Sequence, residues 1–160
     1  MKKDSKGIAW LEVIIVVVIV VLAVKILVPS VFSKPTEINE DSAVRSVRMI
    51  IAAETNYAQA YDTGYSSSLK VLGPPPDAMP SASLAGYLDN ELSAGAKEGY
   101  SFIYRAGPRD ANGRIQSYTL NVNPIRPGVT GTKYYFVDQT GVIRENPSHP
   151  ATVNDTPFGG

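Results

Sequence analysis

The stretch NEDSAVRSVRMIIAAETNYAQAYDTG, residues 39–64, decides the fold that the sequence predicts. Its apolar side chains recur every three or four positions, which is the period of an amphipathic α-helix. Asn39 or Asp41 can cap this helix, or the helix can continue from the residues before it, and Gly64 ends it. The predicted apolar face consists of Ala43, Val44, Val47, Ile50, Ile51, Tyr57, Ala58 and Tyr61.

Glu54 lies near the middle of this apolar face. A buried carboxylate has to be paired or hydrogen-bonded, because burial otherwise costs it the solvation that water provides. We expect an arginine, a tyrosine hydroxyl or loop amides to satisfy it. A catalytic acid would need a partner group, and none stands out in the sequence.

After the helix, the sequence is first rich in turns and then alternates between polar and apolar residues with a period of two. Pro74-Pro75-Pro76 is extended, a short helix is predicted over Leu84–Leu92, and residues 145–160 read as a loose tail. Turns are predicted at Asn112-Gly113 and at residues 138–141. The predicted strands are Tyr100–Arg105, Ser117–Val122, Lys133–Val137 and Val142–Arg144.

Before the helix, residues Ile8–Val28 form a long apolar run that is preceded by three lysines and one aspartate. As a helix this run would extend about 31 Å, close to the thickness of a bilayer core. The positive-inside rule places residues 1–7 in the cytoplasm. A cleaved secretory signal ending near Val31-Phe32-Ser33 and a plain signal anchor are the alternatives, and neither explains the carboxylate of Glu12 within the run.

The spacing of Gly7, Ile8, Glu12 and Pro29 resembles the N-terminus of type IV pilins and pseudopilins. The resemblance implies that a prepilin peptidase cuts between Gly7 and Ile8 and N-methylates Ile8. It also implies that Glu12 acts in subunit assembly. Ile8 replaces the phenylalanine usual in the family, and Trp10 is bulky for a packing position. Pro29 lacks an N–H group, so a helix kink is expected there.

Elementary electrostatics agrees with this resemblance. Cleavage would create an ammonium group on Ile8 one helical turn from Glu12, and opposite charges attract strongly in a medium of low dielectric constant. In the family, the glutamate of an entering subunit meets the ammonium group of its neighbour. A glutamate that reaches toward lipid headgroups is the alternative.

The composition of the 160-residue chain argues against most other chemistry. With 15 basic and 15 acidic residues, no net field favours direct binding of nucleic acid. The chain has no cysteine and a single histidine, His149, so we predict no catalytic site, metal or cofactor. Ser67-Ser68-Leu69-Lys70 lacks the companion motifs of penicillin-binding enzymes, and the turn at residues 138–141 has too few carboxylates for calcium.

These features together predict an α+β pilin-like fold. In it, a long N-terminal helix with a membrane-spanning first half packs against an antiparallel sheet of three or four strands. The segments are a leader (1–7), an apolar transmembrane and assembly helix (8–28), its amphipathic continuation (29–62) and a globular head (63–160).

The predicted function is that of a structural subunit of a type IV pilus or pilus-like filament. Its partners would be identical subunits, the prepilin peptidase, the inner-membrane assembly machinery and, before assembly, the lipid bilayer. The predicted location is the bacterial inner membrane before assembly, and an extracellular or periplasm-spanning filament afterwards. The alternatives are a type II secretion pseudopilin or minor pilin, and a membrane-tethered binding domain with an uncleaved signal anchor.

Overall fold

A computed structural model describes residues 14–18, 35–77 and 79–159. The chain divides into two compact units, Met1–Lys34 and Pro35–Gly160. In the first unit, residues 14–18 are helical and their side chains are about half exposed. The second unit contains all the other described elements, and it is called the head below.

The helix predicted from the opening stretch is α2, Pro35–Tyr61. Its first described residue is Pro35, before both predicted caps, and proline suits the first turn of a helix because its φ is already fixed near the helical value. It ends where Asp62 and Gly64 adopt positive φ angles of 50° and 73°. The predicted apolar face is confirmed in its central part, where Val47 and Ile50 are fully buried.

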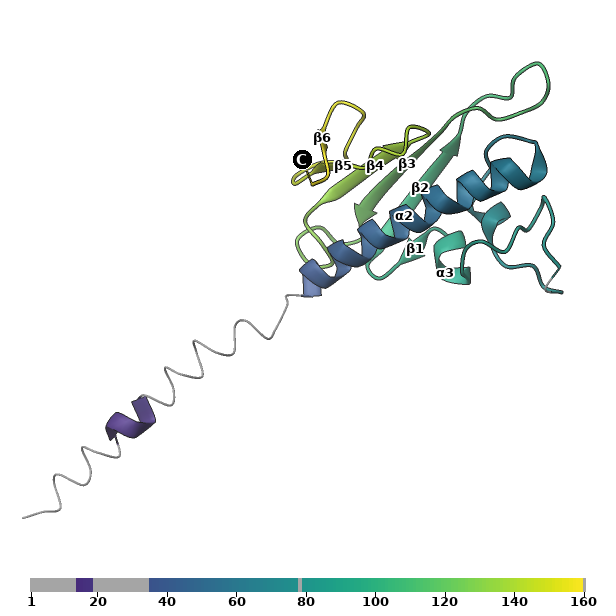
Figure 1. Cartoon of the computed structure of the whole chain (residues 1–160). Coiled ribbons are helices and arrows are strands. Elements are labelled where there is room, and N and C mark those ends of the chain that lie inside the picture. The colour runs from purple at the N-terminus through teal and green to yellow at the C-terminus, as the bar shows by residue number, and fades with distance from the viewer. Residues whose placement is uncertain (1–13, 19–34, 78, 160) are drawn as a thin grey trace, which may run out of the picture. The chain divides into compact units, whose positions relative to one another are not determined.

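The sheet has six antiparallel strands in the order β1-β2-β3-β4-β5-β6, so each strand pairs with the next one along the chain (Figure 1). Its central strands, β2 (Tyr100–Ala106), β3 (Tyr118–Pro124) and β4 (Tyr134–Asp138), confirm three of the predicted strands. β5 covers Arg144–Asn146, two residues later than predicted. The edges are two-residue strands, β1 (Ala96–Lys97) and β6 (Thr156–Pro157).

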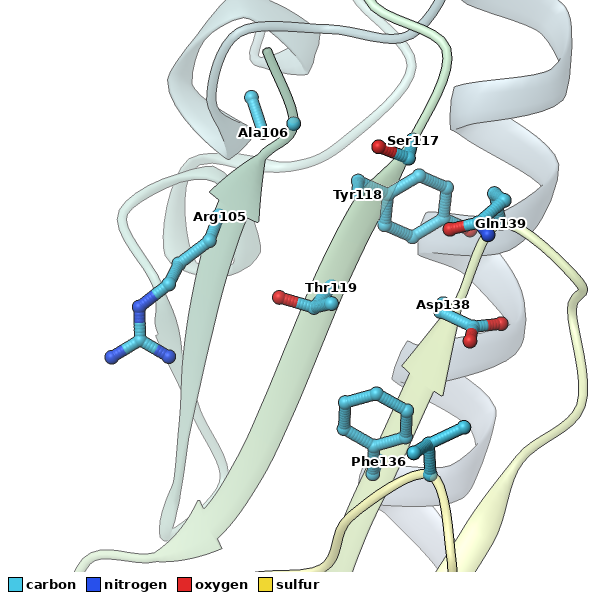
Figure 2. Close-up of a pocket in the computed structure, with 10 residues that line it drawn as sticks. Arg105, Ala106, Ser117, Tyr118, Thr119, Phe136, Asp138 and Gln139 are labelled. Atoms are coloured by element: carbon cyan, nitrogen blue, oxygen red, sulfur yellow. The ribbon is translucent and has the colours of Figure 1, made fainter.

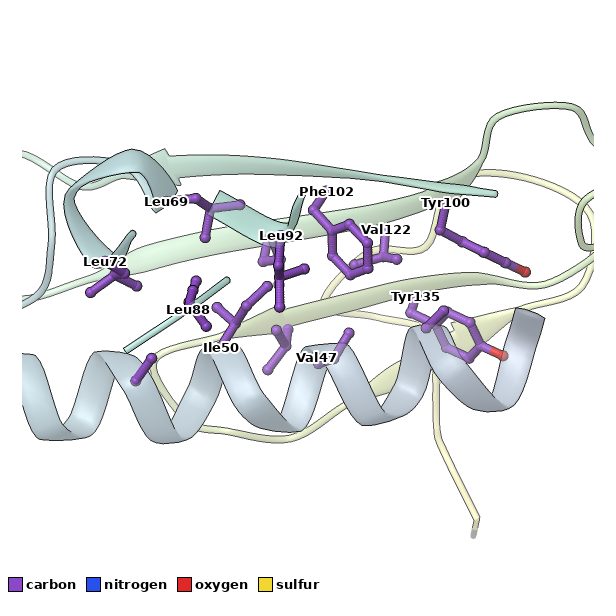
Figure 3. Packing of buried hydrophobic residues seen from close by; sticks show 14 of the residues in the cluster. Val47, Ile50, Leu69, Leu72, Leu88, Leu92, Tyr100, Phe102, Val122 and Tyr135 are labelled. Atoms are coloured by element: carbon purple, nitrogen blue, oxygen red, sulfur yellow. The ribbon is translucent and has the colours of Figure 1, made fainter. Parts of the chain in front are cut away.

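The core lies between α2 and one face of this sheet (Figure 3). Alternate residues of the central strands point toward the helix, so that Leu120 and Val122 of β3 are fully buried beneath it. Tyr100 and Tyr135 extend the core toward the start of α2, and their rings lie 6.2 Å apart. The 3-10 helix η1 (Leu69–Leu72) and the short helix α3 (Asn90–Ser93) contribute leucines to the same cluster.

The structure corrects the predicted fold class. The sheet has six strands instead of three or four, and the sequence missed β1 and β6 because two residues are too few to show a period. Among the described residues, the expected long helix with a membrane-spanning first half is not found either, since α2 covers Pro35–Tyr61. No helix among the described residues is both long enough and apolar enough to cross a bilayer. The predicted inner-membrane location is therefore corrected too; residues 8–13 and 19–28 of the expected span lie outside the described residues.

Two further local predictions are wrong. The helix expected over Leu84–Leu92 is reduced to α3, because Gly86 has a φ of 74° and Ala85 N–H donates to Val71 O of η1 at 2.8 Å instead of to a helical partner. The loose tail is in fact ordered. Asn146 is buried and donates to Asp155 Oδ1 at 2.7 Å, which closes the segment between β5 and β6 into a loop.

Candidate functional site

The four residues that the sequence assigns to processing and assembly cannot be placed. Gly7, Ile8, Glu12 and Pro29 all lie outside the described residues. Their roles in cleavage, methylation, subunit pairing and kinking therefore stay predictions. The described head offers two other features with functional potential: the buried carboxylate of Glu54 and a groove on the outer face of the sheet.

Glu54 is fully buried inside the head, and its carboxylate accepts two hydrogen bonds from Ser66 in the loop that follows α2. Ser66 N–H donates to Oε2 at 2.8 Å, and Ser66 Oγ donates to Oε1 at 2.6 Å. Tyr104 OH donates to the carbonyl of Ser66 at 2.9 Å, which fixes this loop from the other side. Of the three partners predicted for Glu54, an arginine, a tyrosine hydroxyl or loop amides, the structure shows one loop amide, and it adds the hydroxyl of Ser66, which was not predicted.

The electrostatics of this cluster favour protonated phenols. Burial raises the pKa of Glu54, while the two hydrogen bonds from Ser66 act in the opposite direction. Burial also raises the pKa of Tyr104 and of Tyr118, and the nearby Glu54 carboxylate raises both further. Both phenols therefore stay protonated at neutral pH, and that of Tyr104 donates to Ser66 O. A carboxylate surrounded by neutral hydroxyl groups anchors the loop to α2.

The outer face of the sheet, opposite α2, carries a groove of about 420 Å³. The strand register places Arg105 of β2, Thr119 of β3 and Asp138 of β4 in one row across the sheet, because Arg105 pairs with Thr119 and Thr119 pairs with Asp138. Figure 2 shows the three side chains on neighbouring strands, with Phe136 on the same strand as Asp138. The lining residues are Arg105, Ala106, Gly107, Ser117, Tyr118, Thr119, Phe136, Asp138, Gln139 and Val153.

The groove combines a cation, hydroxyl groups and an anion. One oxygen of the Asp138 carboxylate already has partners, because Oδ1 accepts hydrogen bonds from Thr140 N at 2.9 Å and from Thr140 Oγ1 at 2.5 Å. The groove contains no imidazole and no second carboxylate that could act as a general base toward a hydroxyl. Within the described ranges, no three histidine or acidic side chains are arranged to hold a metal ion. The groove therefore offers a cation, hydroxyl groups and one carboxylate that could bind a polar group.

Reasoning from the sequence missed this row of side chains. Each of the three residues has an outward position on its own strand, which the alternation predicts. Their alignment depends on the pairing register across two loops of different length, and no local pattern in the sequence specifies that register.

Comparison of the chain with protein-family models, with curated proteins and with solved structures finds no match.

Proposed function

We propose that the chain is a structural subunit of a pilin-like filament. In this proposal a prepilin peptidase cuts between Gly7 and Ile8, and the subunits polymerise through the segment that begins at Ile8. The observation that carries the proposal is the position of Glu12, four residues after the predicted new N-terminus and inside an apolar run.

The physical basis is the cost of a charge in apolar surroundings. A lone carboxylate there is unfavourable by about 2.5–3.5 kcal/mol on insertion scales. An ammonium group on Ile8 of a neighbouring subunit would compensate it. Buried ion pairs add little net stability, but removing one partner is costly, so such a pair sets the register between subunits. Identical register at every contact is what a helical polymer requires.

The head is compatible with a structural role. The groove on its sheet offers charged and hydroxyl groups that could contact a neighbouring molecule. A compact unit with a rigid helix at the start of the head would present the same surface at each step of a filament.

The first test is mass spectrometry of the mature protein from its native host. The proposal expects a polypeptide that begins at Ile8 and carries one additional methyl group. A protein that begins at Met1, or one cut near Ser33, would refute it.

The second test is the substitution Glu12→Ala, with Glu91→Ala as the matched control. Glu91 is an exposed carboxylate on α3, so its removal changes the net charge equally without touching the proposed contact. We expect Glu12→Ala to abolish or sharply slow filament formation seen by electron microscopy, while Glu91→Ala leaves it unchanged. Undiminished filaments from Glu12→Ala would contradict the proposed pairing.

A further inference from the structure

The loop between β5 and β6 covers only one half of the outer face of the sheet. On the β4 side, Asn121 Nδ2 donates to Ala151 O of this loop at 3.0 Å, and the ring of Phe136 is buried. On the β2 side, Ile103 belongs to the same row of paired residues as Asn121 and Phe136, but its side chain is 41% exposed. The β2 half of this face therefore presents an apolar side chain to solvent.

The neighbouring row on the same face carries opposite charges at its two ends. Arg105 of β2 and Asp138 of β4 lie on either side of Thr119 of β3, so two strand spacings, about 9–10 Å, separate their backbones. They form no ion pair with each other, and Arg105 forms none with any other residue in the described part of the chain. Asp138 uses Oδ1 for its hydrogen bonds to Thr140, which leaves Oδ2 for another partner.

This charged row is complementary to itself under one particular symmetry. When two copies of a surface meet around a twofold axis, residue i contacts residue j and residue j contacts residue i. An axis parallel to β3 at Thr119 places Arg105 of each copy opposite Asp138 of the other copy. An axis perpendicular to the strands would place Arg105 opposite Arg105 and Asp138 opposite Asp138, which is repulsive. The charges therefore select the axis parallel to β3.

The axis selected by the charges also covers the exposed apolar side chain. It brings the β2 side of one copy against the β4 side of the other, so that the loop between β5 and β6 of one copy lies over Ile103 of the other. Val153 of this loop lines the outer-face groove and is 51% exposed. The loop that protrudes from one half of the face thus meets the uncovered half of the second copy.

We propose that the outer face of the sheet is a self-association surface, through which two copies of this chain pair around a twofold axis along β3. Arg105 of each copy pairs with Asp138 of the other, and Val153 of each packs on Ile103 of the other. Sheets packed face to face lie about 10 Å apart, a distance that arginine and aspartate side chains bridge together. The surface consists of exposed charges and few apolar groups, so the association is weak and transient. It goes beyond the proposed filament function and does not depend on it.

Cross-linking of the full-length chain tests the position of the axis, because the sequence contains no cysteine. Thr119 lies at the axis and meets its own counterpart, so Thr119→Cys should give a dimer with a short bifunctional maleimide. The matched control is Gln59→Cys, at an exposed position on α2, which packs on the opposite face of the sheet. This control should give little product. Equal yields from the two variants would overturn the proposal.

A charge exchange in the Thr119→Cys chain tests the specific pairing. Arg105→Asp makes both ends of the row acidic, and Asp138→Arg makes both ends basic. Each variant alone loses both ion pairs, so we expect about tenfold less dimer, which corresponds to about 1.4 kcal/mol. Mixing the two chains should restore the yield as a mixed dimer, identified by its mass, because each acidic end then meets a basic end. Arg109→Asp, the same charge change at an exposed position outside the groove, should leave the yield unchanged.

A second variant keeps this test decisive. Asp138→Arg removes the acceptor for Thr140, so its fold is checked by circular dichroism. If it is unfolded, Asp138→Asn replaces it, because the amide oxygen still accepts from Thr140. Mixed with the Arg105→Asp chain, it should give more mixed dimer than the Arg105→Asp chain gives by itself, since one pair of opposite charges returns. Mixtures that restore nothing would overturn the proposed pairing.

This proposal and the filament function fail in different ways. If filaments depend on Glu12 but cross-linking shows no preference for Thr119, only the contact between the outer faces is wrong. If the chain begins at Met1 in its host and Thr119 is still the preferred position, the filament function is wrong and the self-association surface stands.

Discussion

The carboxylate of Glu54 allows a sharp test of how the head is held together. In Glu54→Ala, the buried N–H of Ser66 loses its acceptor, which costs about 1–3 kcal/mol, and the vacated volume adds a cavity penalty. The substitution also removes the cost of burying a carboxylate away from water, which offsets part of this loss of stability. We expect the free energy of unfolding to fall by about 2 kcal/mol in urea denaturation followed by circular dichroism.

The substitution Glu54→Gln separates the hydrogen bonds from the charge. A glutamine oxygen can still accept from Ser66 N–H. Its amide group can donate to Ser66 Oγ, which in turn has Ser68 O as an acceptor at 3.1 Å. At pH 7 we therefore expect a change within about 1 kcal/mol, much smaller than for alanine.

The stability difference between wild type and Glu54→Gln should also change with pH, in a direction set by the pKa of Glu54. The pKa of Glu54 in the native state lies above the ordinary value of 4.5. Between those two pKa values the native state keeps a proton that the unfolded state has released, so this group's contribution to stability falls as the pH rises through that window. The advantage of wild type over Glu54→Gln should therefore shrink as the pH rises above the ordinary pKa of 4.5.

The exposed carboxylate of Glu91 supplies the control, because Glu91→Gln should be nearly neutral in stability. Two results would refute the reasoning: a Glu54→Ala variant within about 0.5 kcal/mol of wild type, or a difference between wild type and Glu54→Gln that stays constant across the pH range.

Two other predictions follow from close contacts in the head. Gly64→Ala should lower the free energy of unfolding by more than about 2 kcal/mol, because a Cβ atom there would meet Ile115 O at 2.1 Å and φ is 73°. The control Gly128→Ala, with a φ of 78° and open space around it, should lower the free energy of unfolding by only about 1 kcal/mol. Equal losses in the two variants would show that the contact with Ile115 does not matter. Asn146→Ala should release the loop between β5 and β6, because its side chain accepts hydrogen bonds from two backbone N–H groups at 3.0 and 3.1 Å. Limited proteolysis should then cleave this loop faster than in wild type or in the exposed control Asn154→Ala, and unchanged cleavage would contradict the role assigned to Asn146.

Prediction from the sequence worked where the pattern is local and repeated. The central strands β2, β3 and β4 were all predicted, from alternation in β2 and β3 and from the aromatic and β-branched run of β4. The buried state of Glu54 followed from its position on the apolar face of α2, although which loop would hold it did not. Ser66 lies 12 residues further along the chain, and its position depends on the turn at Asp62–Gly64.

Prediction failed where single long-range contacts decide the structure. A helix was predicted over Leu84–Leu92, yet the first part of this stretch pairs with η1 through backbone hydrogen bonds from Ala85, Tyr87 and Leu88. The segment after β5 has the composition of a loose tail, yet Asn146 and Asp155 close it into a loop. A contact between residues far apart in sequence leaves no periodic trace, so these elements could not be inferred from local patterns.

The sequence by itself determined the amphipathic helix, the central strands, the absence of disulfides and the unusual glutamate in the N-terminal apolar run. These properties depend on residue type and spacing within one segment. Only the tertiary structure decided that the sheet has six strands and that Arg105, Thr119 and Asp138 form a row across it. It also decided that Tyr57, Thr63 and Arg109 line one cavity. Those arrangements depend on strand register and loop closure, because these bring together side chains that the chain order keeps apart.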